Sequence, residues 1–259
     1  MELNLNADLG ESFGAWKMGD DAAMLGIVGS ASIACGFHAG DPLVMRRTVH
    51  AAKKAGVSIG AHPSYPDLQG FGRRPMQMAA DELQATVLYQ LSALAGIARV
   101  EGMTMTHVKP HGALSNMAAE DEALANRFAR AVRTFDAELI LLAPAGSKLV
   151  TAGEHEGLVV AGEVFADRAY NEQGHLVPRS QPGAVLTDTR ECVRHVLRML
   201  DAGGIVSMSG RRLAVPFHSV CVHGDNAHAV EVARAVRKAL EDSGCELKPL
   251  AQLSTLGRR

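Results

Sequence analysis

Ionisable side chains gather in short clusters, each of which follows an apolar run of the sequence. Seven clusters of polar residues occur: Asn6–Glu11, Cys35–Asp41, Gly60–Pro63, His107–Gly112, Pro144–Ser147, Glu163 with Asp167 and Arg168, and His223–Asp225. Continuous apolar runs are typical of buried parallel strands, and in β/α barrels catalytic groups lie where such strands end. The clusters therefore predict one site assembled from the whole length of the chain, as in an enzyme. Only Pro144–Ser147 offers no ionisable group.

The first cluster supplies two carboxylates. Asp8 follows its apolar run directly, and Glu11 comes three residues later in a turn that contains Gly10. Two carboxylates at a strand end can divide acid and base roles or hold a metal. The plainer interpretation is a solvated loop in which Asp8 caps the next segment. We favour a functional role for Asp8 and leave Glu11 open.

The second cluster combines a histidine with a helix start. His38 lies between Gly36 and Gly40, where the backbone can approach a ligand closely. Asp41 precedes Pro42, which is typical of a helix N-cap, so a capping role is expected for Asp41 whatever else it does. A nucleophilic pair of Cys35 with His38 is less favoured, because Cys35 fits the pattern of a small apolar barrel residue.

Histidines and a lysine follow the third and fourth apolar runs. His62 precedes Pro63, and His107, Lys109 and His111 alternate along one extended segment. A period of two places these three side chains on one face of a strand. If that face lines a barrel, Lys109 is a buried cation that needs an anionic partner such as Asp8, Glu163 or a bound phosphate or carboxylate. His107, the deepest, is expected to serve packing.

Anion recognition is expected from the long segment after the sixth run. Arg168, Tyr170 and Arg179 lie in residues 167–185, a long irregular stretch of the kind that forms lids and binding loops. Arginines suit bidentate recognition of carboxylate or phosphate, although a salt-bridged surface loop is the plainer interpretation. His223 and Asp225 bring a further histidine and carboxylate to the same rim.

Alternating strand and helix signals run through all 259 residues. Strands are expected at 3–8, 31–35, 57–61, 105–108, 139–142, 158–164 and 220–222, with a small β excursion at 205–215. Helices are expected at 41–55, 79–101, 119–135, 147–154, 187–200 and 227–240. The pattern predicts an α/β fold with a single parallel β/α barrel, seven-stranded and distorted, spanning residues 1–259. A doubly wound open sheet is the alternative.

Composition narrows the class of partner. The formal net charge of −2 provides no basic field, which argues against nucleic acid or a membrane surface as the main partner. No signal-peptide pattern or membrane-length apolar run occurs, and the four cysteines show no paired spacing. We expect a cytoplasmic protein with reduced thiols. No Gly-x-x-x-x-Gly-Lys-Ser/Thr string occurs. If this chain binds ATP, it must do so with a different phosphate-binding loop; otherwise the nucleotide site lies on a partner subunit.

Several strings together resemble the LamB/YcsF family, the A subunits of bacterial 5-oxoprolinase. They are Asn6–Glu11, Cys35–Pro42, Gly60–Asp67, Phe71–Arg74, His107–Leu114 and Val222–Asp225, in order between residues 2 and about 250. The resemblance implies a seven-stranded β/α barrel related to glycoside hydrolases and polysaccharide deacetylases. It also implies ATP-dependent opening of 5-oxo-L-proline to L-glutamate, with or without Mg²⁺, in a complex with subunits B and C.

Chemical roles can be assigned on that basis. Lys109 with Arg168 or Arg179 would neutralise phosphoryl charge, and Asp8 or Glu163 would act as general base. His38, His62 or His111 would move protons. Substrate or phosphate binding is expected from a further group: Glu11, Asp41, Arg168, Tyr170, Arg179, His223 and Asp225.

Two other functions stay open. Asp8, His38 and His62 could hold a metal with an open position for water, as in a metal-dependent deacetylase or amidohydrolase acting on a small amide. Alternatively, the chain binds the lactam while its partners perform the chemistry.

Overall fold

Seven parallel strands form a closed barrel in the computed structural model, which describes residues 1–224 and 228–257. The strands are β1 (Glu2–Leu9), β2 (Ser30–Ala34), β3 (Ser58–His62), β4 (Met105–Val108), β5 (Ile140–Pro144), β6 (Val159–Phe165) and β9 (Ser219–Val222). Each pairs with the next in this order, and β9 closes the ring by pairing with both β6 and β1. The predicted seven-stranded barrel is confirmed, and the open-sheet alternative is wrong.

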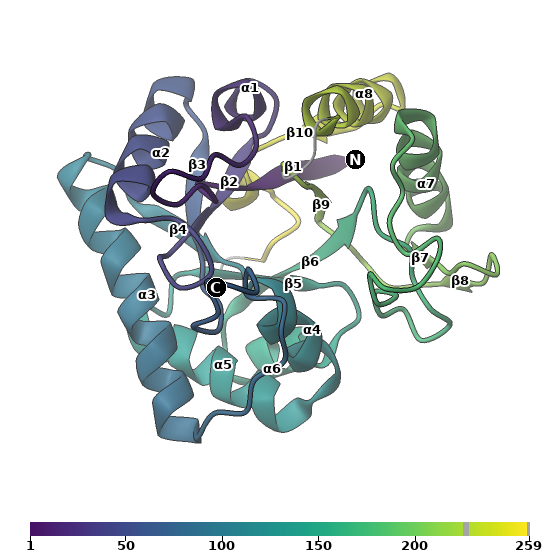
Figure 1. Ribbon diagram of the computed structural model, residues 1–259. Helices are drawn as coiled ribbons and strands as arrows, with labels where there is room; N and C mark the ends of the chain where they lie inside the picture. Colours follow the sequence, from purple (N-terminus) through teal and green to yellow (C-terminus); the bar gives the residue numbers. More distant parts are fainter. Residues whose placement is uncertain (225–227, 258–259) are drawn as a thin grey trace.

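Helices surround this ring on its outside (Figure 1). They are α1 (Asp21–Leu25), α2 (Pro42–Ala55), α3 (Ala80–Val100), α4 (Gly112–Glu120), α5 (Glu122–Phe135), α6 (Lys148–His155), α7 (Thr189–Ala202) and α8 (Ala229–Asp242). The predicted β excursion is a small antiparallel hairpin of β7 (Ile205–Val206) and β8 (Arg212–Leu213). Near the C-terminus, β10 (Glu246–Leu247) pairs with β1, and a 3₁₀ turn, η1, covers Leu250–Gln252. Across the described residues, no helix is both long and apolar enough to cross a membrane.

The predicted helix at 119–135 is wrong in its first part. Helix α4 begins at Gly112, directly after the fourth strand-end cluster, and α5 begins at Glu122. Asp121 separates them because its backbone is extended and its side chain accepts a hydrogen bond from the Leu124 N–H, which caps α5. Helix α1 was not predicted. By contrast, α2 starts after the Asp41 cap and ends at left-handed Gly56, as expected.

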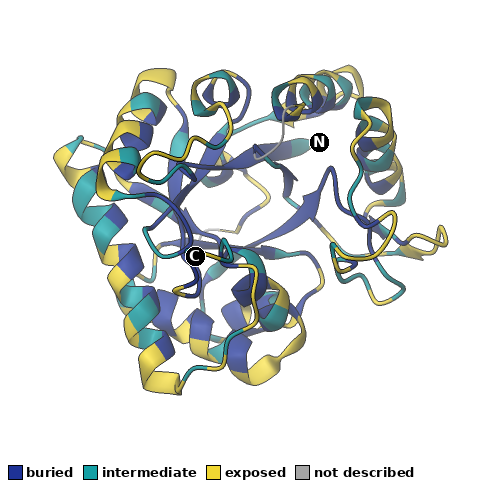
Figure 2. Cartoon of the chain, viewed as in Figure 1, coloured by how far each residue is buried: buried dark blue, intermediate teal, exposed yellow. Residues whose placement is uncertain are grey.

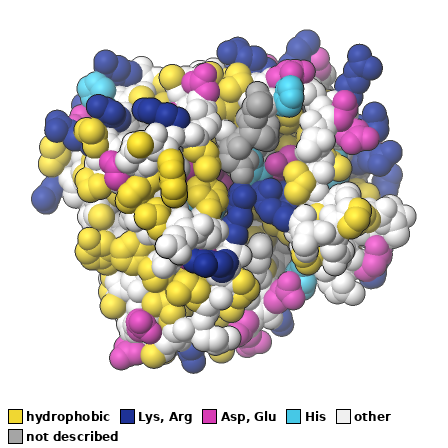
Figure 3. Space-filling model, viewed as in Figure 1, with side chains coloured by type: hydrophobic (Ala, Val, Ile, Leu, Met, Phe, Trp, Pro, Cys, Tyr) yellow, Lys and Arg dark blue, Asp and Glu magenta, His cyan; other side chains and the backbone are white. Residues whose placement is uncertain are grey.

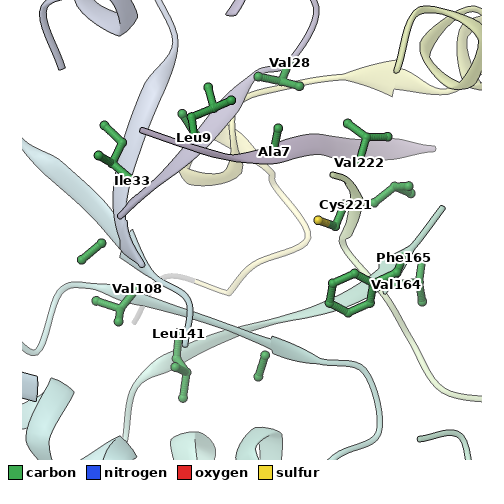
Figure 4. Packing of buried hydrophobic residues seen from close by; sticks show 14 of the residues in the cluster. Ala7, Leu9, Val28, Ile33, Val108, Leu141, Val164, Phe165, Cys221 and Val222 are labelled. Carbon is green, nitrogen blue, oxygen red and sulfur yellow. The ribbon is translucent and has the colours of Figure 1, made fainter. Parts of the chain in front are cut away.

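Strand β1 separates apolar and polar side chains between its two faces. Leu3, Leu5 and Leu9 belong to the main hydrophobic cluster, part of which is shown in Figure 4. Burying each such side chain contributes about 1.5–3 kcal/mol. The alternate residues, Asn4 and Asn6, are fully buried and polar. The barrel interior is therefore polar along this strand, and the apolar core lies between strands and helices, whose outer surfaces are exposed (Figure 2).

Hydrogen bonds satisfy the polar groups inside the barrel. The Asn4 side-chain amide donates to Ser30 Oγ at 3.0 Å, and Ser219 Oγ donates to Asn4 Oδ1 at 2.7 Å. Asn6 Nδ2 donates to Ser219 Oγ at 2.8 Å. A buried polar group without a partner would cost about 1–3 kcal/mol, so this network makes a polar barrel interior stable. It leads from the barrel floor to the carboxyl ends of the strands.

Candidate active site

The carboxyl ends of the strands open into a pocket of about 370 Å³, within the usual range of small-molecule sites. Most of the predicted site residues line it: Asp8, Glu11, His62, Lys109, His111, Arg168, Tyr170, Arg179 and His223. His38 and Glu163 lie behind the lining residues and contact them. The strand-end clusters are thus brought together as one site.

Lys109 lies between two carboxylates. Its Nζ is 2.8 Å from Asp8 Oδ1 and 3.0 Å from Glu163 Oε1, and all three side chains are buried. Burial opposes the charge on Lys109, but Asp8 together with Cys221 and Glu163 raises its pKa well above the usual value. Burial also opposes ionisation of Asp8, yet His62 and Lys109 hold the pKa of Asp8 well below its usual value. An ammonium and a carboxylate therefore face the pocket as a stable pair.

Glu163 differs from Asp8 because it is 1% exposed and burial raises its pKa above the usual value, despite the nearby Lys109. Its Oε1 accepts hydrogen bonds from Lys109 and, at 2.7 Å, from Asn6 Nδ2. Lys109 Nζ also lies 3.3 Å from Asn6 Oδ1 and 3.1 Å from Cys221 Sγ. Asn6 was not among the predicted site residues, although its alternation with Asn4 and Asp8 along β1 is a detectable signal.

Three histidines and Glu11 form the opposite wall. His62 Nδ1 donates to the Lys109 carbonyl at 2.7 Å, and His111 Nε2 donates to the Phe71 carbonyl at 2.8 Å. His38 stacks on His111 with a ring separation of 3.8 Å, and His38 Nε2 is 3.0 Å from Glu11 Oε1. Burial and neighbouring histidines lower the pKa of both His38 and His111 well below the usual value. His38 and His111 are therefore neutral near pH 7.

Atoms that could ligate a metal occur in two groups among the described residues. Glu11, His38, His62 and His111 each offer a ligand atom, and these atoms lie within 4.8 Å of one another. Asp8, Cys221 and His223 form a second such group. The metal set expected from the sequence, Asp8 with His38 and His62, is thus divided between the two groups, although Asp8 Oδ2 lies 3.3 Å from His62 Nε2.

The loop between β3 and α3 closes over these histidines. Gly72 has a φ of +64°, and a Cβ at this position would lie 2.8 Å from the His111 ring, so only glycine fits without strain. The preceding Phe71 carbonyl fixes His111, and the following Arg73 guanidinium lies 4.9 Å from the Phe71 ring centroid and lines the pocket. Arg73, within a string quoted for the family resemblance, was not among the predicted site residues.

Arg73, Arg168 and Arg179 line the pocket together, and Lys and Arg side chains border a hollow on this face of the molecule (Figure 3). Arg168 is buried, and its guanidinium donates to the carbonyls of Val177 at 2.7 Å and Ala184 at 3.3 Å. Burial and the neighbouring Arg179 lower the pKa of Arg168 to about 10. Because positive groups are crowded here, an anion bound at this mouth would be stabilised.

The segment after β6 is held by specific contacts. Tyr170 is 2% exposed, its hydroxyl accepts a hydrogen bond from the Phe165 N–H at 2.8 Å, and burial raises its pKa. His223 Nδ1 lies 2.7 Å from Asp167 Oδ1, which ties this segment to the end of β9. The segment predicted as a lid or binding loop is therefore anchored at both Asp167 and Tyr170, with its arginines at the pocket.

Asp41 is not part of this arrangement. Asp41 accepts hydrogen bonds from the backbone N–H groups of Leu43, Val44 and Gly14, so it caps α2 and does not line the pocket. Asp225 lies outside the described residues. Ser147, from the cluster that suggested no chemistry, does line the pocket, and its buried Oγ has no hydrogen-bond partner among the described residues.

Solved structures with similar folds place the barrel in a broad class. The catalytic domain of a peptidoglycan N-acetylglucosamine deacetylase from Eubacterium rectale is similar with a TM-score of 0.51 and 11% identity, covering 99% of this chain and 91% of that one. At this identity the likeness concerns the fold alone. The chain is a seven-stranded β/α-barrel protein whose fold is similar to that of this domain, and its ionisable residues lie at the carboxyl ends of the strands.

The chain belongs to the LamB/YcsF family, whose sequence profile matches residues 3–255. It is 64% identical over 253 residues to the A subunit of 5-oxoprolinase from Azoarcus sp., covering 98% of this chain and 99% of that protein. It is 52% identical to the A subunit of 5-oxoprolinase from Rhodopseudomonas palustris (strain BisB5), covering 97% and 100%. A lactam utilization protein from Thermus thermophilus has a crystal structure with a TM-score of 0.89 and 44% identity, covering 96% and 99%. The family expected from the sequence is confirmed.

Proposed function

We propose that this chain is the A-type component of an ATP-dependent 5-oxoprolinase, which opens 5-oxo-L-proline to L-glutamate in the cytoplasm together with subunits B and C. The names of its close relatives and the lactam utilization protein support the substrate. The observation that carries the chemistry is the Asp8–Lys109 pair, which faces a pocket whose mouth holds three arginines. Such a site can combine a base with stabilisation of phosphate charge.

The reaction needs ATP because a five-membered lactam is an unactivated amide. In our mechanism the lactam oxygen attacks the γ-phosphorus of ATP, so an O–P bond forms and ADP leaves. Water then adds to the former carbonyl carbon and loses a proton to a base. The C–N bond breaks, the nitrogen gains a proton, and an acyl phosphate remains. A second water hydrolyses this acyl phosphate to L-glutamate and inorganic phosphate.

Residue roles follow from where each side chain lies. Asp8 acts as the general base towards water, since it is ionised and reaches the pocket. Lys109, with Arg73 and Arg179, neutralises charge on the phosphoryl group, while Glu163 positions Lys109 from behind. Asp8, once it has taken a proton from the water, passes that proton to the leaving nitrogen. Arg168, bonded to backbone carbonyls, orders the segment that carries Arg179.

A second candidate function is a metal-dependent hydrolase of a small amide. The group of Glu11, His38, His62 and His111 favours it, because imidazole and carboxylate are ligands of catalytic metals. A cation held there would supply Lewis-acid polarisation of an amide carbonyl.

The deciding experiment measures glutamate formation from 5-oxoproline by this chain alone and with subunits B and C, each with and without ATP. The proposal predicts turnover only with all three subunits and ATP, with one ADP formed per glutamate. Turnover by the isolated chain without ATP would support the metal-dependent hydrolase instead. If substitutions of Asp8 or Lys109 left turnover of the full complex intact, the chain would act only as a lactam-binding component.

A further inference from the structure

Four potential metal ligands come from the ends of four successive strands. Glu11 follows β1, His38 follows β2, His62 ends β3 and His111 follows β4. All four side chains are at most 8% exposed. In a parallel barrel, neighbouring strands end side by side, so these residues meet although they span the first hundred or so positions of the chain. The arrangement depends on four separate segments and is not a local surface cluster.

Backbone carbonyls fix the rings of two histidines so that their other nitrogens face each other. A carbonyl oxygen only accepts hydrogen bonds, so His62 carries a proton on Nδ1, which faces the Lys109 carbonyl, and its Nε2 is the nitrogen that faces Asp8 and His111. By the same reasoning, His111 is protonated on Nε2, which faces the Phe71 carbonyl, and its Nδ1 is a lone pair. His62 Nε2 lies 3.0 Å from His111 Nδ1 and 3.3 Å from Asp8 Oδ2, so a positive species, either a proton or a metal cation, is stabilised at this point.

Glu11 adds negative charge at the same point. Its Oε1 lies 3.5 Å from His111 Nδ1 and 3.0 Å from His38 Nε2. The other nitrogen of His38, Nδ1, is buried and has no hydrogen-bond partner among the described residues. His38 is therefore held through its Nε2 side and through stacking on His111. A carboxylate oxygen and three ring nitrogens surround one small volume.

The spacing of these atoms can be compared with a tetrahedral site. Bonds of about 2.0–2.1 Å from a Zn²⁺ ion to nitrogen and oxygen place neighbouring ligand atoms about 3.3–3.4 Å apart. Three of the six separations, at 3.0, 3.5 and 3.0 Å, bracket that edge length, and all six are within 4.8 Å. The second requirement, fixed ring orientation, is met by the backbone carbonyls behind His62 and His111, which are the usual partners of metal-ligating histidines.

We propose that Glu11, His38, His62 and His111 form a site for one divalent transition-metal ion of the Zn²⁺ class. Three imidazoles with one carboxylate suit Zn²⁺, Co²⁺ or Ni²⁺ and do not suit Mg²⁺, which prefers oxygen ligands. The site is separate from any Mg²⁺ that accompanies ATP. Because Glu11, His62 and His111 line the pocket, the ion would lie at its wall, beside Asp8.

Metal binding can be tested without lactam or ATP, so the outcome does not depend on the proposed function. The full chain is purified without chelators for metal analysis, then stripped and titrated with Zn²⁺ by calorimetry and with Co²⁺ by visible absorption. We expect about one ion per chain and no displacement by excess Mg²⁺. Glu11→Gln and His111→Ala should each weaken Zn²⁺ binding by at least about tenfold.

His50→Ala provides the matched control, because His50 is an exposed histidine on α2 and its loss should leave Zn²⁺ affinity unchanged. Glu11→Gln preserves side-chain size, so it remains informative if His111→Ala fails to fold. Three results would overturn the proposal: no Zn²⁺ bound by the stripped chain, wild-type affinity in Glu11→Gln, or an equal loss of affinity in His50→Ala.

Discussion

Lys109 Nζ lies 2.8 Å from Asp8 Oδ1, although 101 positions of sequence separate the two residues. The contact forms because β1 and β4 belong to one closed barrel, in which Asp8 and Lys109 both turn inwards at the carboxyl end. Removing one partner of a buried ion pair leaves an uncompensated charge, at a cost of about 3–5 kcal/mol. The pair is therefore both a structural tie across the barrel and the proposed reactive centre.

Asp8→Asn and Lys109→Ala should each lower ATP-coupled glutamate formation by about 10²–10⁴-fold in the complex with subunits B and C. Asp8→Asn removes the proposed base, and Lys109→Ala removes the charge that stabilises the phosphoryl group. Circular dichroism on each purified variant separates loss of chemistry from loss of fold. Near-normal turnover in both variants would rule out the proposed roles.

Glu163→Gln should keep turnover within about tenfold of wild type, a far smaller loss than for Asp8→Asn. The amide oxygen of glutamine can still accept from Asn6 and Lys109, as Glu163 Oε1 does at 2.7 and 3.0 Å. The comparison of kcat between the two variants decides which carboxylate is the base. An equal loss in Glu163→Gln would assign Glu163 a share of that role.

Arg73→Ala and Arg179→Ala should each raise the KM for ATP or 5-oxoproline by about tenfold, since a charge-assisted hydrogen bond contributes roughly 1.5–3 kcal/mol. Arg133→Ala on the exposed surface of α5 is the control and should leave both constants unchanged. Steady-state kinetics of the assembled complex give the answer. Unchanged KM values in both pocket variants would show that Arg73 and Arg179 do not bind the substrates.

Acid should weaken the tie between Asp167 and His223. Burial alone would raise the pKa of Asp167, but His223 holds it below its usual value. A lowered pKa in the folded state contributes stability above the unfolded pKa of about 3.9, and that contribution is lost as pH falls through the folded pKa.

The measurement is the free energy of unfolding of wild type and Asp167→Asn at several pH values. The free energy of unfolding of the wild type should exceed that of Asp167→Asn by a constant amount above about pH 5, and this difference should decrease below about pH 4. A difference in unfolding free energy that stayed constant down to about pH 2 would contradict a contribution from the lowered pKa of Asp167.

Thiol labelling tests whether a cysteine could act as nucleophile. Burial raises the pKa of Cys35 and of Cys192 to about 12, and Cys35 Sγ donates to the Ile33 carbonyl at 3.2 Å. All four cysteines are free and buried. We expect slow reaction with a thiol reagent at about pH 8 and rapid reaction of all four thiols in guanidinium chloride. Fast labelling of Cys35 in the native protein would revive the Cys35–His38 pair.

Much of the fold could be predicted because its signals are local. Apolar runs and their polar ends identify seven strands to within a few residues, and Asp41-Pro42 and Gly56 delimit α2. The missed boundary at Asp121 shows the limit of this reasoning. A helical pattern that continues on both sides of a residue does not reveal that its side chain caps a new helix.

The β/α barrel and the position of its polar residues at the strand ends can be predicted from the sequence, because strand periodicity and residue type are properties of short segments. Which of these polar groups come into contact depends on how the strands close into the barrel. Barrel closure sets Asp8 against Lys109, while the β3–α3 loop lays Phe71 and Gly72 over His111. Barrel closure also groups His38 and His62 with Glu11 and His111. Distances between strand ends depend on register and closure, which no segment encodes alone.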